Sequence, residues 1–197
     1  MESDSKKPRW GFLIDLRRCI GCHSCTVACK AENEVPLGVF RCWVKTVEVG
    51  RYPRVRRMFL PQLCNNCENP PCVAVCPVEA TWKREDGIVV VDPHKCIGCR
   101  YCMASCPYGV RYLHPTMNIV EKCHWCVHRV ERGLRPACVE ACPAGARIFG
   151  DLNDPDSGIS RMLSLNPIQG LKPDLGTGPQ TFYIGMDNRL VEEEETS

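Results

Sequence analysis

The chain has 197 residues, of which 44% are hydrophobic and 24% are charged, ordinary values for a globular protein of one domain, or of one domain with an extension. Its formal net charge of +2 gives no electrostatic reason to expect nucleic acid or a polyanionic substrate. The unusual feature is the 17 cysteines, a density typical of proteins built around disulfides or metal.

The N-terminal part of the chain contains no recognisable targeting segment. Residues 1–9 are polar and lead into an apolar run at 11–16, which we expect to form a strand. The pair Arg17-Arg18 lies inside a cysteine loop and lacks the apolar stretch that follows a twin-arginine signal. No run in the sequence approaches the roughly 18 apolar residues of a membrane helix, so we expect no membrane span.

Sixteen of the cysteines fall into four groups of four. Group one is Cys19, Cys22, Cys25 and Cys29; group two is Cys64, Cys67, Cys72 and Cys76; group three is Cys96, Cys99, Cys102 and Cys106; and group four is Cys123, Cys126, Cys138 and Cys142. Cys42 alone stands outside them, in the apolar stretch FRCWVK, and we expect it to be a buried free thiol.

Regular structure is predicted to be sparse and short. After the third cysteine of group one, residues 26–32 suit a single helical turn, and residues 103–106 suit another after the third cysteine of group three. The β-branched run 88–92 predicts a second strand. A proline follows the last cysteine of three groups and redirects the chain there: Pro77, Pro107 and Pro143. We therefore expect bound metal to supply much of the folding energy.

The composition changes beyond Gly150, where the cysteines stop. Residues 151–178 are rich in Pro, Gly, Asp and Ser, and we interpret them as an extended arm. Residues 191–197 include four consecutive glutamates and are predicted to form a mobile acidic tail.

The four groups repeat in alternation. Groups one and three share the start Cys-Ile-Gly-Cys, preceded by an apolar run and an Asp, whereas groups two and four share Cys-Val-x-x-Cys-Pro-x-x-Ala. Duplicated modules indicate a repeated site rather than one unique active centre.

The spacing within the groups is that of iron–sulfur proteins. Groups one and three have the Cys-x2-Cys-x2-Cys-x3-Cys spacing of bacterial two-cluster ferredoxins. Group two widens the middle gap to four residues and group four widens it to eleven, which we interpret as loop insertions. One tight loop reaches three iron corners of a cubane, and the fourth thiolate comes from the partner motif. The sixteen grouped cysteines therefore predict four [4Fe–4S] clusters.

Three other interpretations are weaker. Zinc ribbons use two Cys-x2-Cys knuckles and need neither a third cysteine at this spacing nor a Cys-x3-Cys-Pro end. A disulfide framework would come with a signal peptide and scattered spacings. Histidine ligation by His23 or His124 is conceivable, but cysteine already fills the ligand positions.

Two further sets of residues have predicted places. The basic run Arg51, Arg54, Arg56 and Arg57 fits a solvated face better than a docking patch. Six aromatic residues are expected to shield the clusters from water: Trp43, Trp82, Tyr101, Tyr108, Tyr112 and Trp125.

Several stretches resemble one family. ENEVPLGVF after Cys29, CENPPC in group two and CPYGVRYLHP in group three are similar to the four-cluster electron-transfer (beta) subunits of molybdopterin oxidoreductases of the DMSO reductase superfamily. The iron–sulfur subunits of polysulfide reductases are the most similar, followed by those that serve thiosulfate, tetrathionate and arsenate reductases. The resemblance covers residues 10–150.

The resemblance implies an α+β fold of tandem bacterial-ferredoxin-like modules with pseudo-twofold symmetry. Residues 1–150 would form the four-cluster domain, with 60–115 as an inserted ferredoxin-like unit, and 151–197 an extension. It also implies how the ligands are shared. Cluster one would bind Cys19, Cys22, Cys25 and Cys142; cluster two Cys29, Cys123, Cys126 and Cys138; cluster three Cys76, Cys96, Cys99 and Cys102; and cluster four Cys64, Cys67, Cys72 and Cys106. Some relatives carry Trp in place of Cys99 and hold a [3Fe–4S] cluster, so all four clusters here are expected to be cubanes.

The function implied is electron relay without catalysis. The protein would be one component of a membrane-bound respiratory molybdenum or tungsten reductase of the polysulfide, thiosulfate or DMSO type. Its partners would be a molybdopterin catalytic subunit, near clusters one and two, and an integral membrane quinone-reactive subunit, near clusters three and four. We expect it at the cytoplasmic membrane through these partners, on the extracytoplasmic face if it is co-exported with the catalytic subunit and on the cytoplasmic face otherwise. The alternative is a free-standing polyferredoxin carrier.

Overall fold

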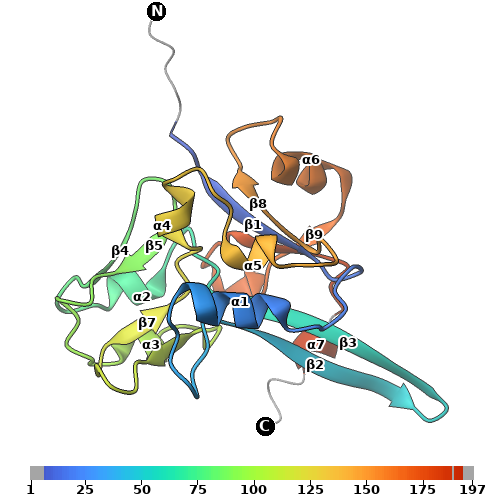
Figure 1. Ribbon diagram of the computed structural model, residues 1–197, viewed down its shortest axis with the longest axis horizontal. Coiled ribbons are helices and arrows are strands. Elements are labelled where there is room, and N and C mark those ends of the chain that lie inside the picture. Colours follow the sequence, from blue (N-terminus) through green and yellow to red (C-terminus); the bar gives the residue numbers. More distant parts are fainter. Residues whose placement is uncertain (1–6, 188, 193–197) are drawn as a thin grey trace, which may run out of the picture.

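The computed structural model describes residues 7–187 and 189–192 (Figure 1). Its strands are β1 (Trp10–Asp15), β2 (Cys42–Arg51), β3 (Arg54–Leu63), β4 (Thr81–Lys83), β5 (Val89–Val91), β6 (Arg111–Leu113), β7 (Val120–Lys122), β8 (Arg147–Asp151), β9 (Ile168–Gln169) and β10 (Thr181–Ile184). Its helices are α1 (Ser24–Glu32), α2 (Pro71–Ala74), α3 (Tyr101–Ala104), α4 (Val127–Val130), α5 (Ala137–Glu140), α6 (Gly158–Leu165), the 3₁₀ helix η1 (Pro173–Leu175) and α7 (Arg189–Glu192).

The largest sheet has β1 near its centre, in the order β8-β1-β10-β9. Strand β1 pairs with β8 in the antiparallel sense and with β10 in the parallel sense. Its residues 11–15 are all buried, as a strand that is covered on both faces requires. The predicted strands at 11–16 and 88–92 are thus confirmed, within one residue, as β1 and β5.

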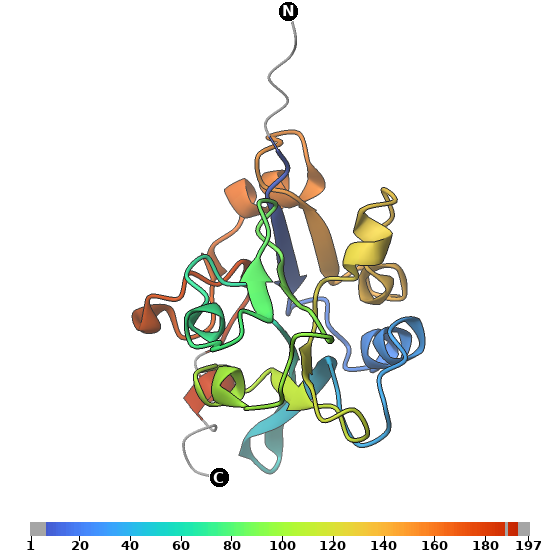
Figure 2. The ribbon, with the colours of Figure 1, turned by 90° about the vertical axis from the view of Figure 1, so that its left-hand side faces the viewer.

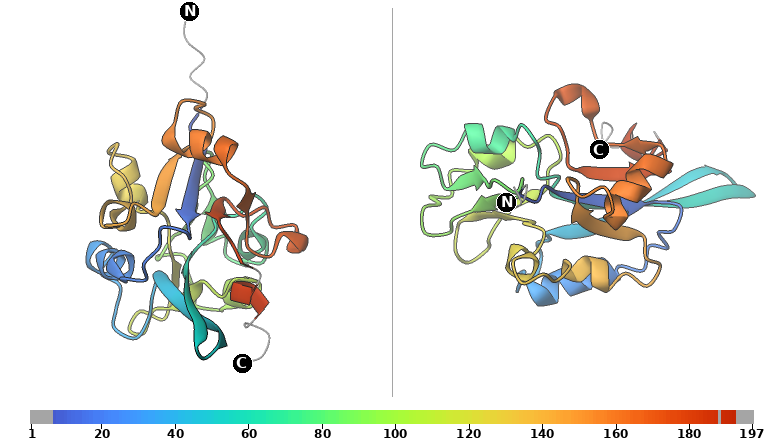
Figure 3. Two further views of the ribbon diagram at one scale, coloured as in Figure 1. Left: turned by 90° about the vertical axis from the view of Figure 1, so that its right-hand side faces the viewer. Right: turned by 90° about the horizontal axis from the view of Figure 1, so that it is seen from above.

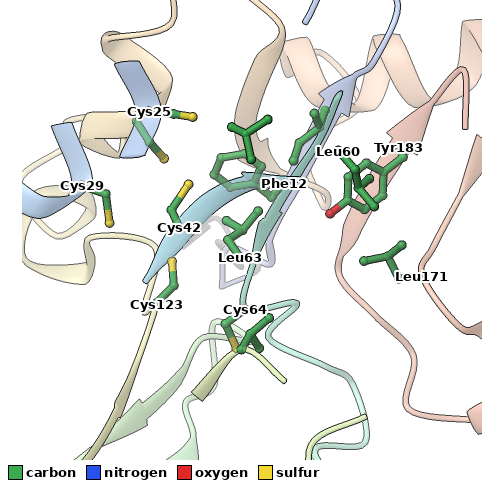
Figure 4. Packing of buried hydrophobic residues seen from close by; sticks show 14 of the residues in the cluster. Phe12, Cys25, Cys29, Cys42, Leu60, Leu63, Cys64, Cys123, Leu171 and Tyr183 are labelled. Atoms are coloured by element: carbon green, nitrogen blue, oxygen red, sulfur yellow. The ribbon is translucent and has the colours of Figure 1, made fainter. Parts of the chain in front are cut away.

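Apolar side chains pack on both faces of this sheet. On one face Phe12 lies with Leu60 and Tyr183 in a buried cluster (Figure 4), and the Tyr183 hydroxyl donates to the Pro61 carbonyl at 3.0 Å. On the other face Leu13 packs against Ile159 of α6. The first cluster also contains cysteines of the predicted metal sites, so the apolar core and these sites are continuous.

Strands β2 and β3 form a long hairpin that extends from the body of the molecule (Figure 3). Its inner end, where Cys42 pairs with Leu63, is buried, and its tip is exposed. The basic run lies at this tip with its arginines exposed, and Arg57 pairs with Glu48 at 2.5 Å. The tip therefore presents the basic run at the surface of the chain.

The short helices that carry cysteines meet in pairs. Helix α1 of group one contacts α5 of group four, and α2 of group two contacts α3 of group three. Figure 2 shows the second pair with its small hairpins β4–β5 and β6–β7 gathered on one side of the molecule. Helices α2 and α5 each follow a proline, Pro70 and Pro136, whose φ suits a helix start.

Two helix predictions need correction. The helix predicted as one turn over 26–32 is the nine-residue α1, which begins at Ser24. The turn predicted at 103–106 is α3, which begins at Tyr101 and ends at Ala104. Both helices begin directly after a non-glycine residue in the left-handed conformation, His23 and Arg100, and the sequence gives no warning of that start.

The segment after Gly150 is not an extended arm throughout. It contains α6, whose cap Ser157 accepts from the Ser160 amide at 3.2 Å, and it continues into β9, η1 and β10. Because β10 lies beside β1, the sheet joins both sides of the boundary drawn at residue 150. Its Thr-Phe-Tyr-Ile run is apolar enough to be buried there. Residues 193–197 of the predicted acidic tail lie outside the described residues, whereas 191–192 belong to α7.

Within residues 7–187 and 189–192, no helix combines the length and the apolar character that crossing a membrane requires.

Candidate iron–sulfur sites

The first site joins the two ends of the cysteine pattern. Three cysteines of group one and the last cysteine of group four line one cavity: Cys19, Cys22, Cys25 and Cys142. Gly21 allows the loop to turn with φ +67°, and a Cβ there would lie 2.2 Å from the Phe59 ring. We call this quartet site one.

Site three repeats this local structure. Its cavity is lined by the last cysteine of group two and three cysteines of group three: Cys76, Cys96, Cys99 and Cys102. Gly98 has φ +68°, and a Cβ there would lie 2.1 Å from the Asn118 carbonyl oxygen. The two Cys-Ile-Gly-Cys loops thus share a backbone turn that only glycine fits.

Site four takes three cysteines from group two and the last cysteine from group three. Its cavity is lined by Cys64, Cys67, Cys72 and Cys106. Site three and site four lie against each other, since Cys72 and Cys102 pack in one buried cluster. This contact follows from the pairing of α2 with α3.

Site two combines groups one and four and is the most buried. Its thiols are Cys29, Cys123, Cys126 and Cys138; all four are buried and are close enough to act on one another electrostatically. The Asn33 side-chain amide donates to the sulfurs of Cys29, at 3.8 Å, and Cys126, at 3.6 Å. The structure therefore places the sixteen cysteines of the four groups in four quartets, each drawn from two groups.

Backbone amides point at several of these sulfurs. In the shared Cys-Pro-x-x-Ala ends, the Ala80 amide donates to Cys76 at 3.2 Å and the Ala146 amide donates to Cys142 at 3.3 Å. Such N–H···S bonds stabilise thiolate and influence the reduction potential of a bound cluster. The two motifs that are alike in sequence are therefore alike in this contact.

The electrostatics of the quartets favour a bound cation. Burial, reinforced by neighbouring thiols, raises the pKa of Cys29 and of Cys67 to about 12, and burial also raises the pKa of Cys138. Such thiols ionise only when positive metal compensates for the loss of water. Two buried guanidinium nitrogens, Nη1 of Arg111 and of Arg147, have no hydrogen-bond partner within the described part of the chain. Arg147 lines site one and Arg111 lines both site three and site four, so acceptor sulfurs of a cluster would satisfy them.

The quartets do not have the geometry of zinc sites. Among the described residues, no three Cys, His, Asp or Glu side chains are arranged to hold a single metal ion, whereas a zinc ion draws four ligands into one tight tetrahedron. His124 faces away from ligation: its Nε2 lies 2.8 Å from Arg41, and burial, followed by the charge of Arg41, lowers its pKa to about 3. The donor set fits a multi-iron cluster.

Cys42 is buried, as predicted, and it has an unexpected neighbour. It lies on β2 among Cys25, Cys29 and Cys123 (Figure 4). A hydrogen bond with Cys42 lowers the pKa of Cys25 to about 5. The Arg147 guanidinium also donates to the Cys42 sulfur at 3.2 Å. Cys42 therefore contacts site one from outside the cysteine groups.

Sequence reasoning missed the buried cations beside the sites. Arg111 and Arg147 each lie five residues after the last cysteine of their group, in Cys-Pro-x-Gly-x-Arg, and this repeat was the available signal. Of the aromatic residues expected to shield the clusters from water, Tyr112 and Trp125 are buried, whereas Trp82 and Tyr101 are exposed.

The fold and these cysteine sites define an α+β protein of ferredoxin-like [4Fe–4S] modules. A family model described as a 4Fe-4S dicluster domain matches residues 55–152, and one described as a 4Fe-4S binding domain matches residues 10–31. The B subunit of tetrathionate reductase from Salmonella typhimurium is 53% identical over 95% of this chain and 76% of its own length.

Other relatives carry related names. The B component of polysulfide reductase from Wolinella succinogenes is 41% identical over 89% of this chain and 94% of its own length. A protein of Halobacterium salinarum, named as the iron-sulfur B component of a putative dimethyl sulfoxide reductase, is 45% identical over 89% of this chain and 78% of its own length. The present protein belongs to the family of iron–sulfur subunits of DMSO reductase-type molybdenum enzymes, and its role is electron transfer.

Proposed function

We propose that the protein binds four [4Fe–4S] clusters, one in each of sites one to four, through the sixteen cysteines of the four quartets. The observation that carries this proposal is the convergence of each quartet from two cysteine groups. A [4Fe–4S] cluster gives or takes one electron at a time. The chain's own contribution is to hold the thiolates, exclude water and set the order of the sites.

The exposure of the cysteines and the contacts between neighbouring sites support a linear arrangement in which site one is followed by site two, site four and site three. Only sites one and three contain exposed cysteines, Cys22 and Cys99. Cys25 of site one acts electrostatically on Cys138 of site two, and Cys64 of site four acts on Cys123 of site two. Sites four and three then meet through Cys72 and Cys102. The outer sites are thus accessible to partners, and the inner sites are enclosed by protein.

The partners are proposed from the relatives. The curated relatives are B subunits of tetrathionate, selenate and sulfite enzymes, among others, so catalysis belongs to another subunit. We propose that a molybdopterin catalytic subunit contacts the site-one end and that a quinone-reactive membrane subunit contacts the site-three end, with residues 60–115 as the unit facing the membrane partner. The protein itself performs no bond-making chemistry. It is held at the membrane by its partners.

Single cysteine variants in the purified complex test this function. Cys22→Ser, Cys29→Ser, Cys67→Ser and Cys99→Ser each remove one ligand from a different site, and each is expected to lower electron flow from quinol to the catalytic subunit at least tenfold. Reduction of the substrate by a small dye that reaches the catalytic subunit directly should persist. Loss of both activities in all four variants, with the complex still assembled, would contradict a relay role. A free-standing carrier would instead fail to co-purify with either partner.

A further inference from the structure

Three cations are buried beside the sites without a carboxylate partner. Arg111, Lys122 and Arg147 are exposed by only 5%, 2% and 4%. In the part of the chain that the structure describes, their side chains contact thiols, hydroxyls, an amide and carbonyls. The buried Arg41 differs, because it forms an ion pair with Glu121 at 2.7 Å. Burying an uncompensated charge is costly, so a negative group is expected beside each of the three.

Arg147 lies between sites one and two. It lines the cavity of site one, and it also hydrogen-bonds Cys138 of site two. It also donates to the sulfur of Cys42 at 3.2 Å, and its Nη1 atom has no hydrogen-bond partner among the described residues. One guanidinium thus reaches the ligands of two sites.

Arg111 occupies the matching position between sites four and three. It lines both cavities, donates to the Cys72 sulfur of site four at 2.9 Å, and hydrogen-bonds Cys102 of site three. No residue that the structure describes accepts a hydrogen bond from its Nη1 atom. Arg111 and Arg147 therefore play equivalent parts in the two halves of the cysteine pattern.

Lys122 lies in the middle gap, between sites two and four. Its ammonium group donates to the carbonyl of Cys123, a site-two cysteine, at 2.8 Å. It also contacts the Val89 carbonyl and lies 3.3 Å from Oδ1 of Asn66, and both residues line site four. Its charge acts on Cys72 of site four. Each gap in the order one-two-four-three thus contains one buried cation.

We propose that Arg147, Lys122 and Arg111 are fixed counter-charges, one for each step between adjacent sites, and that each raises the reduction potential of the clusters on both of its sides. Four thiolates outweigh the positive charge of a [4Fe–4S] core, and reduction adds one more negative charge. A nearby buried cation therefore stabilises the reduced form more than the oxidised form. A cation shared by two sites shifts both of their potentials in the same direction. This inference rests on the proposed assignment of cysteines to sites.

The test is a redox titration of the purified complex, with dithionite as the one-electron reductant and electron paramagnetic resonance as the readout. Arg147→Gln is expected to lower the reduction potentials of two centres by at least about 59 mV, which is a tenfold change in the ratio of oxidised to reduced form for one electron. Arg111→Gln should shift the other two, and Lys122→Met should shift one centre from each pair. Iron content is measured in every variant, so that a lost cluster is not taken for a shifted one.

Matched variants separate charge from packing. Arg147→Lys and Arg111→Lys keep the charge and should keep the wild-type potentials within about threefold, about 30 mV. If the Gln variants fail to assemble, these Lys variants carry the test, and a tenfold shift in them would overturn the proposal. Arg57→Gln removes an exposed charge at the tip of the β2–β3 hairpin, outside the site cavities, and solvent screening should leave all the potentials unchanged.

The outcome also distinguishes this proposal from the proposed function. The cysteine variants assign each resonance to a site independently of the cations. If those assignments hold and the Gln and Met variants leave all potentials unchanged, the counter-charge proposal alone is wrong. If the cysteine variants do not resolve four sites, the proposed function is wrong as well.

Discussion

Cys25 and Cys142 line the same cavity, although they belong to the first and the last cysteine groups of the sequence. Cys29 lies one helical turn after Cys25 on α1, yet its sulfur acts on Cys126 and Cys138. Helix α1 therefore carries one cysteine of site one and one cysteine of site two, and only a short length of backbone separates them. The contact between α1 and α5 brings cysteines of groups one and four together.

This arrangement predicts the spectroscopic effect of single substitutions. Cys25→Ser and Cys142→Ser should perturb the same resonance and the same redox step, because the two thiols belong to one site. Cys29→Ser should perturb a different resonance. The measurement is a potentiometric electron paramagnetic resonance titration of each variant. Loss of one and the same centre in both the Cys25 and the Cys29 variants would mean that each cysteine group wraps its own cluster.

Cys99 provides a test of a single iron corner. Replacement by Trp removes its thiolate, whereas Cys76, Cys96 and Cys102 still line the cavity. We expect Cys99→Trp to convert one centre into a [3Fe–4S] cluster, visible in the oxidised state, because three ligands still hold three irons. Cys99 is exposed, so the bulky ring should be tolerated. An unchanged oxidised spectrum would show that Cys99 is not a ligand.

Metal content tests the number of clusters. Four quartets of cysteine predict about 16 iron atoms for each protein molecule, together with acid-labile sulfide and no zinc. Elemental analysis of anaerobically purified protein measures this directly. Stoichiometric zinc, or iron near half of that value, would contradict four cubanes.

Cluster removal should unfold much of the protein. Burial raises the pKa of Cys29 and of Cys67 to about 12, and cysteines of the sites are part of the main apolar cluster. Without metal, the elements around the four quartets lose what joins them. We expect a chelated, cluster-free sample to lose most of its circular dichroism signal. A native signal in that sample would show that the sheet around β1 is sufficient for the fold.

Cys42 is expected to tune site one. Cys42→Ala removes the hydrogen bond with Cys25 and should lower the reduction potential of the site-one centre, because thiolate then loses a donor. It should also destabilise the protein by about 1 kcal/mol through the small cavity left behind. Val44→Ala is the control, since Val44 lies on the same strand, lines the cavity of site one and has no thiol. It should lower thermal stability and leave the potential unchanged; an equal shift in both variants would refute the role of the Cys42 thiol.

The cysteine spacing alone was enough to predict the kind of cofactor. A tight loop with cysteines three residues apart suits one face of a cubane whatever the rest of the chain does, and the Gly in Cys-Ile-Gly-Cys supplies the turn. The strands at 11–16 and 88–92 were also predictable from nearby residues alone, because apolar β-branched runs bounded by turn residues are a local signal for strands. The alternation of the repeats also predicted that the sites recur.

The tertiary structure decided what depends on distant segments. The burial of β10 beside β1 depends on a pairing partner at the other end of the sequence, and the Pro- and Gly-rich composition before it pointed to an arm. The positions of Arg111, Lys122 and Arg147 followed the same rule: a basic residue in a sequence is expected at the surface, and only packing between cysteine groups brings these three inside. Sequence thus determined the ligands that lie close together along the polypeptide, and the fold determined the charges between them, because electrostatic contact depends on distance in space.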